Sequence, residues 1–78
     1  MIEVYLYGEI KKIVENTVHN ANSIMLCEYV EGENFQEFLN RLGLRTVDVG
    51  NCFINNSPAE LDYILHNNDT IELNPKKN

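Results

Sequence analysis

The stretch CFINNSPAELDYILHNNDTIELNP, residues 52–75, decides the fold. Its last part alternates apolar Ile71 and Leu73 with polar residues, which is the two-residue period of a β-strand. Asn55 and Asn56 favour a tight turn, because Asn tolerates a positive φ better than most residues that carry a side chain. The predicted elements are a strand over 47–55, a short return strand over 58–61, one helical turn over 62–65, a turn over 66–69 and a strand over 70–74 that Pro75 ends.

The sequence before this stretch predicts two further strands. Residues 2–7 (IEVYLY) alternate apolar and other side chains up to Gly8, as a strand with one buried face does. Residues 9–15 carry apolar side chains at helical spacing, so they predict a short helix or a turn. An Asn-rich polar loop follows, and then the apolar run SIMLCEYV over 23–30 indicates a second strand.

A long helix is predicted after residue 33, and it is the clearest helix in the chain. Asn34 is a suitable N-cap, and Glu37, three residues later, completes a capping box. Gly43 supplies the left-handed position that ends many helices. The apolar residues at positions i, i+3, i+4 and i+7 are Phe35, Phe38, Leu39 and Leu42. This single stripe predicts a helix that lies across the sheet and forms half of the core.

Together these elements predict one α+β domain over residues 1–78. The simplest arrangement is one mixed sheet of four to five strands covered by one main helix. The first and last strands are expected to pair in the middle of the sheet, because each alternates along its whole length and has one apolar side. A chain of 78 residues leaves little room for a deep substrate cavity, so the size lowers the expectation of catalysis.

The stretch over 52–75 resembles the C-terminal part of the MoaD/ThiS branch of the β-grasp (ubiquitin-like) superfamily. VYLYGEIKKIV resembles the first strand and short helix of that branch, and EGENFQEFLNRLG resembles its loop and main helix. The similarity is greatest to the ubiquitin-like domain that precedes certain Mut-seven-type RNase domains, over residues 2–75. TGS domains share a similar C-terminal pattern. The resemblance implies a β-grasp fold and a partner such as an RNase or a sulfur-transfer enzyme.

The C-terminal tail departs from the sulfur carriers of this superfamily. Those carriers end in Gly-Gly, and their terminal carboxylate is adenylated and converted to a thiocarboxylate. Here the corresponding residues are Lys76, Lys77 and Asn78, and Asn56 and Asn68 replace two turn glycines. We therefore expect a non-conjugating protein-binding module. The alternatives are a sulfur carrier, if the sequence given is truncated before a Gly-Gly tail, and a TGS-like regulatory domain.

Charge and motifs narrow the expected function further. The net charge of −6 disfavours nucleic acid, which is normally bound through a basic patch, and disfavours the TGS-like alternative. Neither a nucleophile–base motif nor a Cys/His zinc spacing occurs, so we expect no enzyme activity, no metal and no cofactor. Cys27 and Cys52 lie in apolar runs and are expected to be buried thiols. Without a signal-peptide pattern or a long apolar run, the protein is expected to be cytoplasmic.

The acidic residues around the start of the main helix leave a metal site as an alternative, although carboxylates near a helix N-terminus already have a reason in the helix dipole. These residues are Glu28, Glu31, Glu33 and Glu37.

A partner-binding surface is predicted on the face of the sheet away from the long helix. If Val4 and Leu6 face that helix, then Tyr5 and Tyr7 face away from it. The second strand is apolar at consecutive positions, so its own pattern does not decide its orientation. Alignment to the family that it resembles implies that Met25, Cys27 and Tyr29 point inward, which places two more apolar residues beside the tyrosines. A slip of the strand by one residue would reverse this assignment. The predicted surface consists of Tyr5, Tyr7, Ile24 and Leu26. It would contact another protein or a second copy of the chain. The alternatives are scattered apolar surface residues or a cover formed by residues 9–22.

Overall fold

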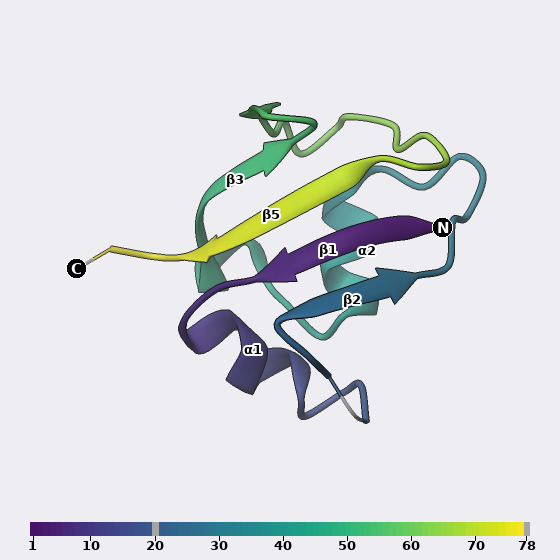
Figure 1. Cartoon of the computed structure of the whole chain (residues 1–78). Helices are drawn as coiled ribbons and strands as arrows, with labels where there is room; N and C mark the ends of the chain where they lie inside the picture. Colours follow the sequence, from purple (N-terminus) through teal and green to yellow (C-terminus); the bar gives the residue numbers. More distant parts are fainter. Residues whose placement is uncertain (20, 78) are drawn as a thin grey trace.

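One mixed sheet of five strands and two helices make up the computed structural model, which describes residues 1–19 and 21–77 (Figure 1). The strands are β1 (Ile2–Leu6), β2 (Ile24–Cys27), β3 (Val49–Ile54), β4 (Ser57–Pro58) and β5 (Thr70–Pro75). The helices are α1 (Glu9–Val14), α2 (Phe35–Arg41) and a 3₁₀ turn, η1 (Thr46–Asp48). The predicted α+β class, with a mixed sheet, is confirmed. In the part of the chain described, no helix has the length and apolar character needed to cross a membrane.

The strand order is β2-β1-β5-β3-β4. β1 and β5 run parallel, with Val4 opposite Ile71, and the other neighbouring strands are antiparallel. The first and last strands therefore pair as predicted, and β5 is the central strand (Figure 1). This arrangement brings residues from both ends of the chain into the middle of one sheet.

α2 lies across one face of the sheet, behind β1 and β5 in Figure 1. Its start has the predicted capping box: the Asn34 side chain accepts a hydrogen bond from Glu37 N, and the Glu37 side chain accepts one from Asn34 N. Gly43, with φ 84°, follows its end as predicted. The stripe of α2 and the inner residues of the strands form one core, whose largest buried members include Phe35, Phe38, Leu39, Ile2, Val4, Ile71 and Leu73.

The predicted short helix is α1, and it completes the core at one end of the sheet (Figure 1). Ile10 and Val14, four residues apart, are both fully buried, and Ile13 packs against the same cluster. The remaining side chains of α1 are charged, and Lys11 and Glu15 form an ion pair on its outer side. α1 is therefore amphipathic and directs its apolar residues toward the core, not toward solvent.

Two strand boundaries differ from the prediction. β2 ends at Cys27 rather than at residue 30, although Tyr29 still packs against the core as expected. β3 begins at Val49, because the preceding residues form η1. The Asp48 carboxylate accepts a hydrogen bond from Arg45 N at 2.8 Å and pairs with its guanidinium at 3.0 Å. These contacts lower the pKa of Asp48 and hold residues 45–48 in a turn instead of a strand.

The segment between β4 and β5 also differs from the prediction. β4 consists of Ser57 and Pro58, so it lies earlier than the expected strand over 58–61. The helical turn expected over 62–65 is displaced: Tyr63 N donates to Glu60 O at 3.1 Å, so the turn spans residues 60–63, and residues 63–65 are not helical. Instead, the backbone oxygens of Leu61 and Tyr63 accept hydrogen bonds from the first residues of α2, and Ile64 forms a bridge with Asn34. The first N–H groups of α2 have no partner within the helix, and these hydrogen bonds to Leu61 and Tyr63 satisfy two of them.

Asp69 fixes the turn that leads into β5. It is buried, and its carboxylate accepts hydrogen bonds from Asn55 Nδ2 at 2.8 Å, His66 N at 2.8 Å and the Tyr63 hydroxyl at 3.2 Å. Burial, reinforced by the nearby Asp69 carboxylate, raises the pKa of Tyr63. Asn55, Asn56 and Asn68 have φ of 52°, 69° and 75°, the conformation predicted for the turn asparagines. The turn chemistry inferred for these positions is therefore confirmed.

Candidate protein-binding surface

The face of the sheet opposite α2 is built by the alternate residues of the strands. Along β1, Ile2, Val4 and Leu6 are buried under α2, so Glu3 and Tyr5 point to the opposite side. We call this second side the open face. It is the side of the sheet that faces the viewer in Figure 1, and neither helix lies across it there.

Strand pairing arranges the open face in rows. Tyr5 lies opposite Ile24 of β2 on one side and opposite Glu72 of β5 on the other. Glu72 in turn lies opposite Phe53 of β3, which lies opposite Pro58 of β4. One row thus crosses all five strands and places a carboxylate between two aromatic residues. Directly opposite side chains in a sheet are close enough to act as one surface.

A second row lies one step along the strands. Leu26 of β2 is opposite Glu3 of β1, which is opposite Thr70 of β5. The Tyr5 hydroxyl donates a hydrogen bond to Glu3 Oε1 at 3.0 Å, so the two rows are connected. This hydrogen bond, together with the negative charge of Glu3, raises the pKa of Tyr5. Tyr5 therefore stays a neutral hydrogen-bond donor beyond the pH at which an ordinary tyrosine ionises.

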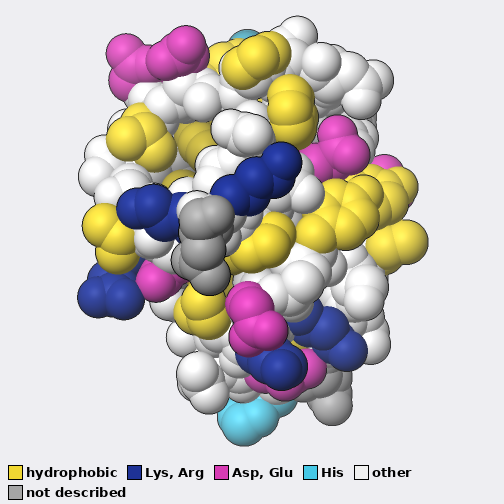
Figure 2. Space-filling model, turned by 90° about the vertical axis from the view of Figure 1, so that its left-hand side faces the viewer, with side chains coloured by type: hydrophobic (Ala, Val, Ile, Leu, Met, Phe, Trp, Pro, Cys, Tyr) yellow, Lys and Arg dark blue, Asp and Glu magenta, His cyan; other side chains and the backbone are white. Residues whose placement is uncertain are grey.

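All four residues predicted to form the partner-binding surface reach solvent. Ile24 is 57% exposed, Leu26 63% and Tyr7 42%, whereas Tyr5 is half-buried because it lies between β2 and β5. Figure 2 shows hydrophobic side chains gathered along its right-hand margin, where the open face is seen from the side, next to acidic ones. Strand pairing places Tyr5, Ile24 and Leu26 on the open face, whereas Tyr7 is exposed just after the end of β1, and the role of these residues in binding stays a prediction.

The alternative in which residues 9–22 cover this surface does not agree with the structure. Ile10 is fully buried in the core under the sheet, and Ile13 packs against the same core. The inward residues of β2 also behave as expected, since Cys27 is buried and Met25 packs against the core. β2 carries apolar side chains on both sides, and the core covers only one of those sides.

The open face is acidic as well as apolar. None of the five strands contains Lys or Arg, and neither Glu3 nor Glu72 has an ion-pair partner among the residues described. Lys76 and Lys77, the basic residues of the predicted tail, follow β5 and are exposed. Asn78, the third residue of the tail, lies outside the described residues. The surface therefore offers unneutralised carboxylates to whatever binds it.

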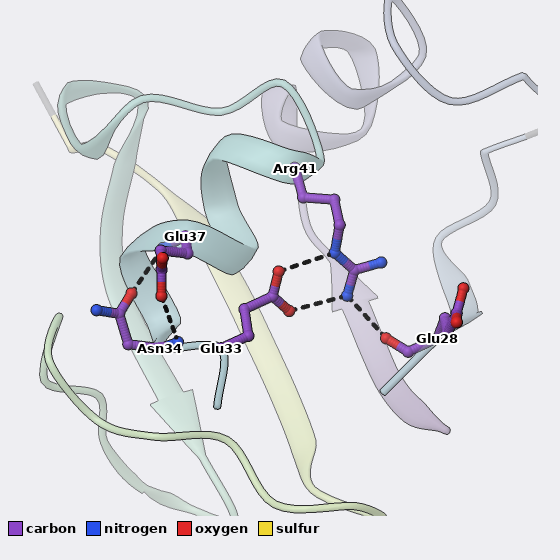
Figure 3. A network of polar contacts seen from close by, with 5 residues as sticks. All are labelled: Glu28, Glu33, Asn34, Glu37 and Arg41. Atoms are coloured by element: carbon purple, nitrogen blue, oxygen red, sulfur yellow. Dashed lines mark hydrogen bonds and ion pairs between the residues drawn. The ribbon is translucent and has the colours of Figure 1, made fainter. Parts of the chain in front are cut away.

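Two of the four carboxylates near the start of α2, those of Glu33 and Glu37, have structural roles. Glu28 contributes its backbone oxygen, and the Glu31 carboxylate forms no hydrogen bond or ion pair among the residues described. Figure 3 shows the guanidinium of Arg41 held by both carboxylate oxygens of Glu33, each at 3.0 Å, and donating to the backbone oxygen of Glu28 at 2.7 Å. Glu37 is used in the capping box with Asn34. Within residues 1–19 and 21–77, no group of three or more potential ligands is arranged to hold a metal ion.

Cys27 and Cys52 are buried free thiols on the covered side of the sheet. Burial raises the pKa of both, and the Cys52 thiol contacts the Gly50 carbonyl at 3.6 Å. A thiol that is hidden from solvent and held protonated is a poor nucleophile, so both residues serve the core.

The residues of the open face that sequence reasoning missed include its carboxylates, Glu3 and Glu72, and the aromatic residue Phe53. The signal for Glu72 was present, because Ile71 and Leu73 alternate around it and must face the core. The sequence does not reveal the strand register that places Glu72 between Tyr5 and Phe53, because register depends on contacts between distant segments.

Over the described residues the structure has no pocket. No protein-family model, no curated protein and no solved structure matches this chain. The candidate surface is therefore the open face, where strand pairing places apolar, aromatic and acidic side chains in adjacent rows.

Proposed function

We propose that this protein is a β-grasp, ubiquitin-like domain that binds another protein through its open face. The parallel pairing of β1 with β5 at the centre, the outer position of β2 and the single α2 across one face support this assignment. They accord with the resemblance of residues 2–75 to the MoaD/ThiS branch. The described residues form no pocket, which favours a binding surface over a substrate site.

The row from Ile24 through Tyr5 and Glu72 to Phe53 carries the proposal. Exposed apolar residues gathered on one side of a small domain mark interaction sites, and tyrosine contributes contact area at little cost in side-chain entropy. The position of Glu72 between two aromatic residues adds a requirement. A partner that covers the row must supply a cation or hydrogen-bond donors to Glu72, because a carboxylate buried without a partner is strongly disfavoured.

The partner class proposed is an RNase of the Mut-seven type, the class indicated by the resemblance. The test is calorimetric titration of the purified RNase domain from the same organism with the wild-type chain and with Tyr5→Ser combined with Leu26→Ser. We expect binding by the wild type and a loss of about a hundredfold in the double variant, since each removed side chain costs on the order of 1–2 kcal/mol.

Val47→Ser is the matched control. Val47 is as exposed as Ile24, at 57%, but lies in η1 outside the sheet. Its replacement should leave binding unchanged. Equal affinities of the wild type and the double variant would show that the open face is not the binding surface.

A further inference from the structure

β2 is an outer strand of the sheet, and its hydrogen bonds to β1 determine which of its backbone groups are used. Leu6 N donates to Ser23 O at 2.7 Å, and these two residues are directly opposite in the β1–β2 register. In an antiparallel pair, hydrogen-bonded and non-hydrogen-bonded residue pairs alternate. Val4 with Met25 is therefore a bonded pair, whereas Tyr5 with Ile24 is a non-bonded pair.

It follows that the backbone N–H and C=O groups of Ile24 and Leu26 point away from the sheet. Among the residues described, no backbone group bonds to them across that edge. Their side chains are the most exposed apolar ones of the strands. The same two residues thus present unused backbone donors and acceptors together with exposed apolar side chains.

The other outer strand, β4, has features that protect a sheet edge. It has only two residues, and one of them is Pro58, which has no N–H to donate. β2 has four residues, IMLC, and contains neither a proline nor a charged residue. An outer strand without such protection is a template for another strand.

The far end of the β2 edge is already closed. Arg41 Nη2 donates to the backbone oxygen of Glu28, and Glu33 binds the same guanidinium with both of its carboxylate oxygens (Figure 3). Pairing beyond β2 would have to displace this charged contact. The open part of the edge is therefore limited to residues 24–27, which sets a short length for any added strand.

We propose that β2 accepts an extended, basic segment of a protein partner as a sixth strand of the sheet. This inference rests on the proposed protein-binding function and names its mode. The charge favours a basic segment: the chain has a net charge of −6, and Glu28 lies beside the edge while Glu3 lies opposite Leu26. A second copy of the chain would bring like charges together, so it is the less favourable occupant.

The probe is a synthetic peptide with a core of alternating valine and threonine and lysines at both ends. We expect the amide protons of Ile24 and Leu26 to become protected from hydrogen exchange when the peptide is added, because strand addition bonds them. The same peptide with glutamates in place of the lysines should bind at least about tenfold more weakly, as like charges oppose association. Equal binding of both peptides would overturn the charge assignment.

Two substitutions at Leu26 separate backbone pairing from side-chain contact. Leu26→Pro removes an N–H that the β1–β2 ladder does not use, and proline is tolerated where the N–H side of an edge strand faces solvent. Leu26→Thr keeps that N–H but shortens the side chain. We expect Leu26→Pro to bind the peptide about tenfold more weakly than Leu26→Thr, the upper end of the effect of one hydrogen bond. Equal loss in both variants would reject strand addition while leaving the open-face proposal standing.

The amide of Met25, which bonds within the ladder, should stay protected in Leu26→Pro and so reports on the fold. If Leu26→Pro unfolds, the wild-type chain is titrated instead with a probe peptide whose backbone amides are methylated where they would bond to β2. Methylation removes these hydrogen bonds, so binding of the methylated peptide would overturn the proposal. Sedimentation of the peptide-free wild type completes the test. A dimer that Leu26→Pro converts to a monomer would show that a second copy, not a basic peptide, occupies the edge.

Discussion

The two faces of the sheet are made by the same strands, yet their residues differ in polarity and in burial. On the side of α2, the alternate residues of β1 are aliphatic and buried. On the open face the same strand contributes Glu3 and Tyr5, joined by a hydrogen bond and partly exposed to water. One strand therefore supplies the core with one set of side chains and the solvent-facing surface with the other, because successive side chains point to opposite faces.

This separation means that substitutions on the covered side should affect stability, while those on the open face should affect association. The core side has close packing to lose, and a small domain has little stability in reserve. Among the residues described, neither helix lies across the open face, so its side chains can change at little cost to the fold.

Phe38→Ala should give the largest effect, because Phe38 is fully buried between α2 and the sheet. The free energy of unfolding is expected to fall by about 3–5 kcal/mol, from lost apolar contacts and the cavity left behind. Urea denaturation followed by circular dichroism measures it. Tyr7→Ala, on the exposed side, is the control and should cost less than about 1 kcal/mol. An unchanged midpoint in Phe38→Ala would mean that α2 does not pack as described.

The contrast between the open face and the covered side can also be tested within β2, by comparing the reactivity of thiols at two adjacent positions. In Leu26→Cys the new thiol lies on the open face next to Cys27, which is buried. Under native conditions the thiol at position 26 should react with iodoacetamide at least about a hundredfold faster than Cys27, which must wait for opening of the structure. Peptide mass spectrometry resolves the two sites. Similar rates would place both side chains in solvent.

The smallest effect concerns the titration of Tyr5. Its hydrogen bond to Glu3 raises its pKa, so Glu3→Gln should move that pKa back toward the ordinary value for tyrosine. Tyrosinate absorbance is measured against pH for the wild type and for Glu3→Gln, and the curve of Tyr5→Phe identifies the part of the signal that belongs to Tyr5. Because the folded state holds the proton more tightly, stability should decrease slightly as pH rises above the ordinary tyrosine pKa. A Tyr5 pKa that Glu3→Gln leaves in place would rule out this hydrogen bond as its cause.

Local patterns were sufficient for most of the fold. The alternation over residues 2–7, the capping box at Asn34 and the turn asparagines each depend on near neighbours, and the structure contains all three. The non-helical form of residues 63–65 was missed because it depends on contacts with the start of α2, far away in the sequence. The strand register also depends on distant contacts. For this reason Tyr5 was predicted to belong to the candidate surface, but its neighbour Glu72 was not.

The central position of β5 determines when this sheet can form. Its partner β1 lies at the other end of the sequence, with Glu3 opposite Thr70 and the N-terminal amine bonded to Asn67. Within the sheet, β5 is the strand that joins the β2–β1 pair to the β3–β4 pair. Without β5, the chain can form at most two separate strand pairs, each with an unpaired inner edge, and isolated strand pairs are only marginally stable. Assembly of the sheet waits for the last strand to leave the ribosome, and the long sequence separation of its contacts slows that step.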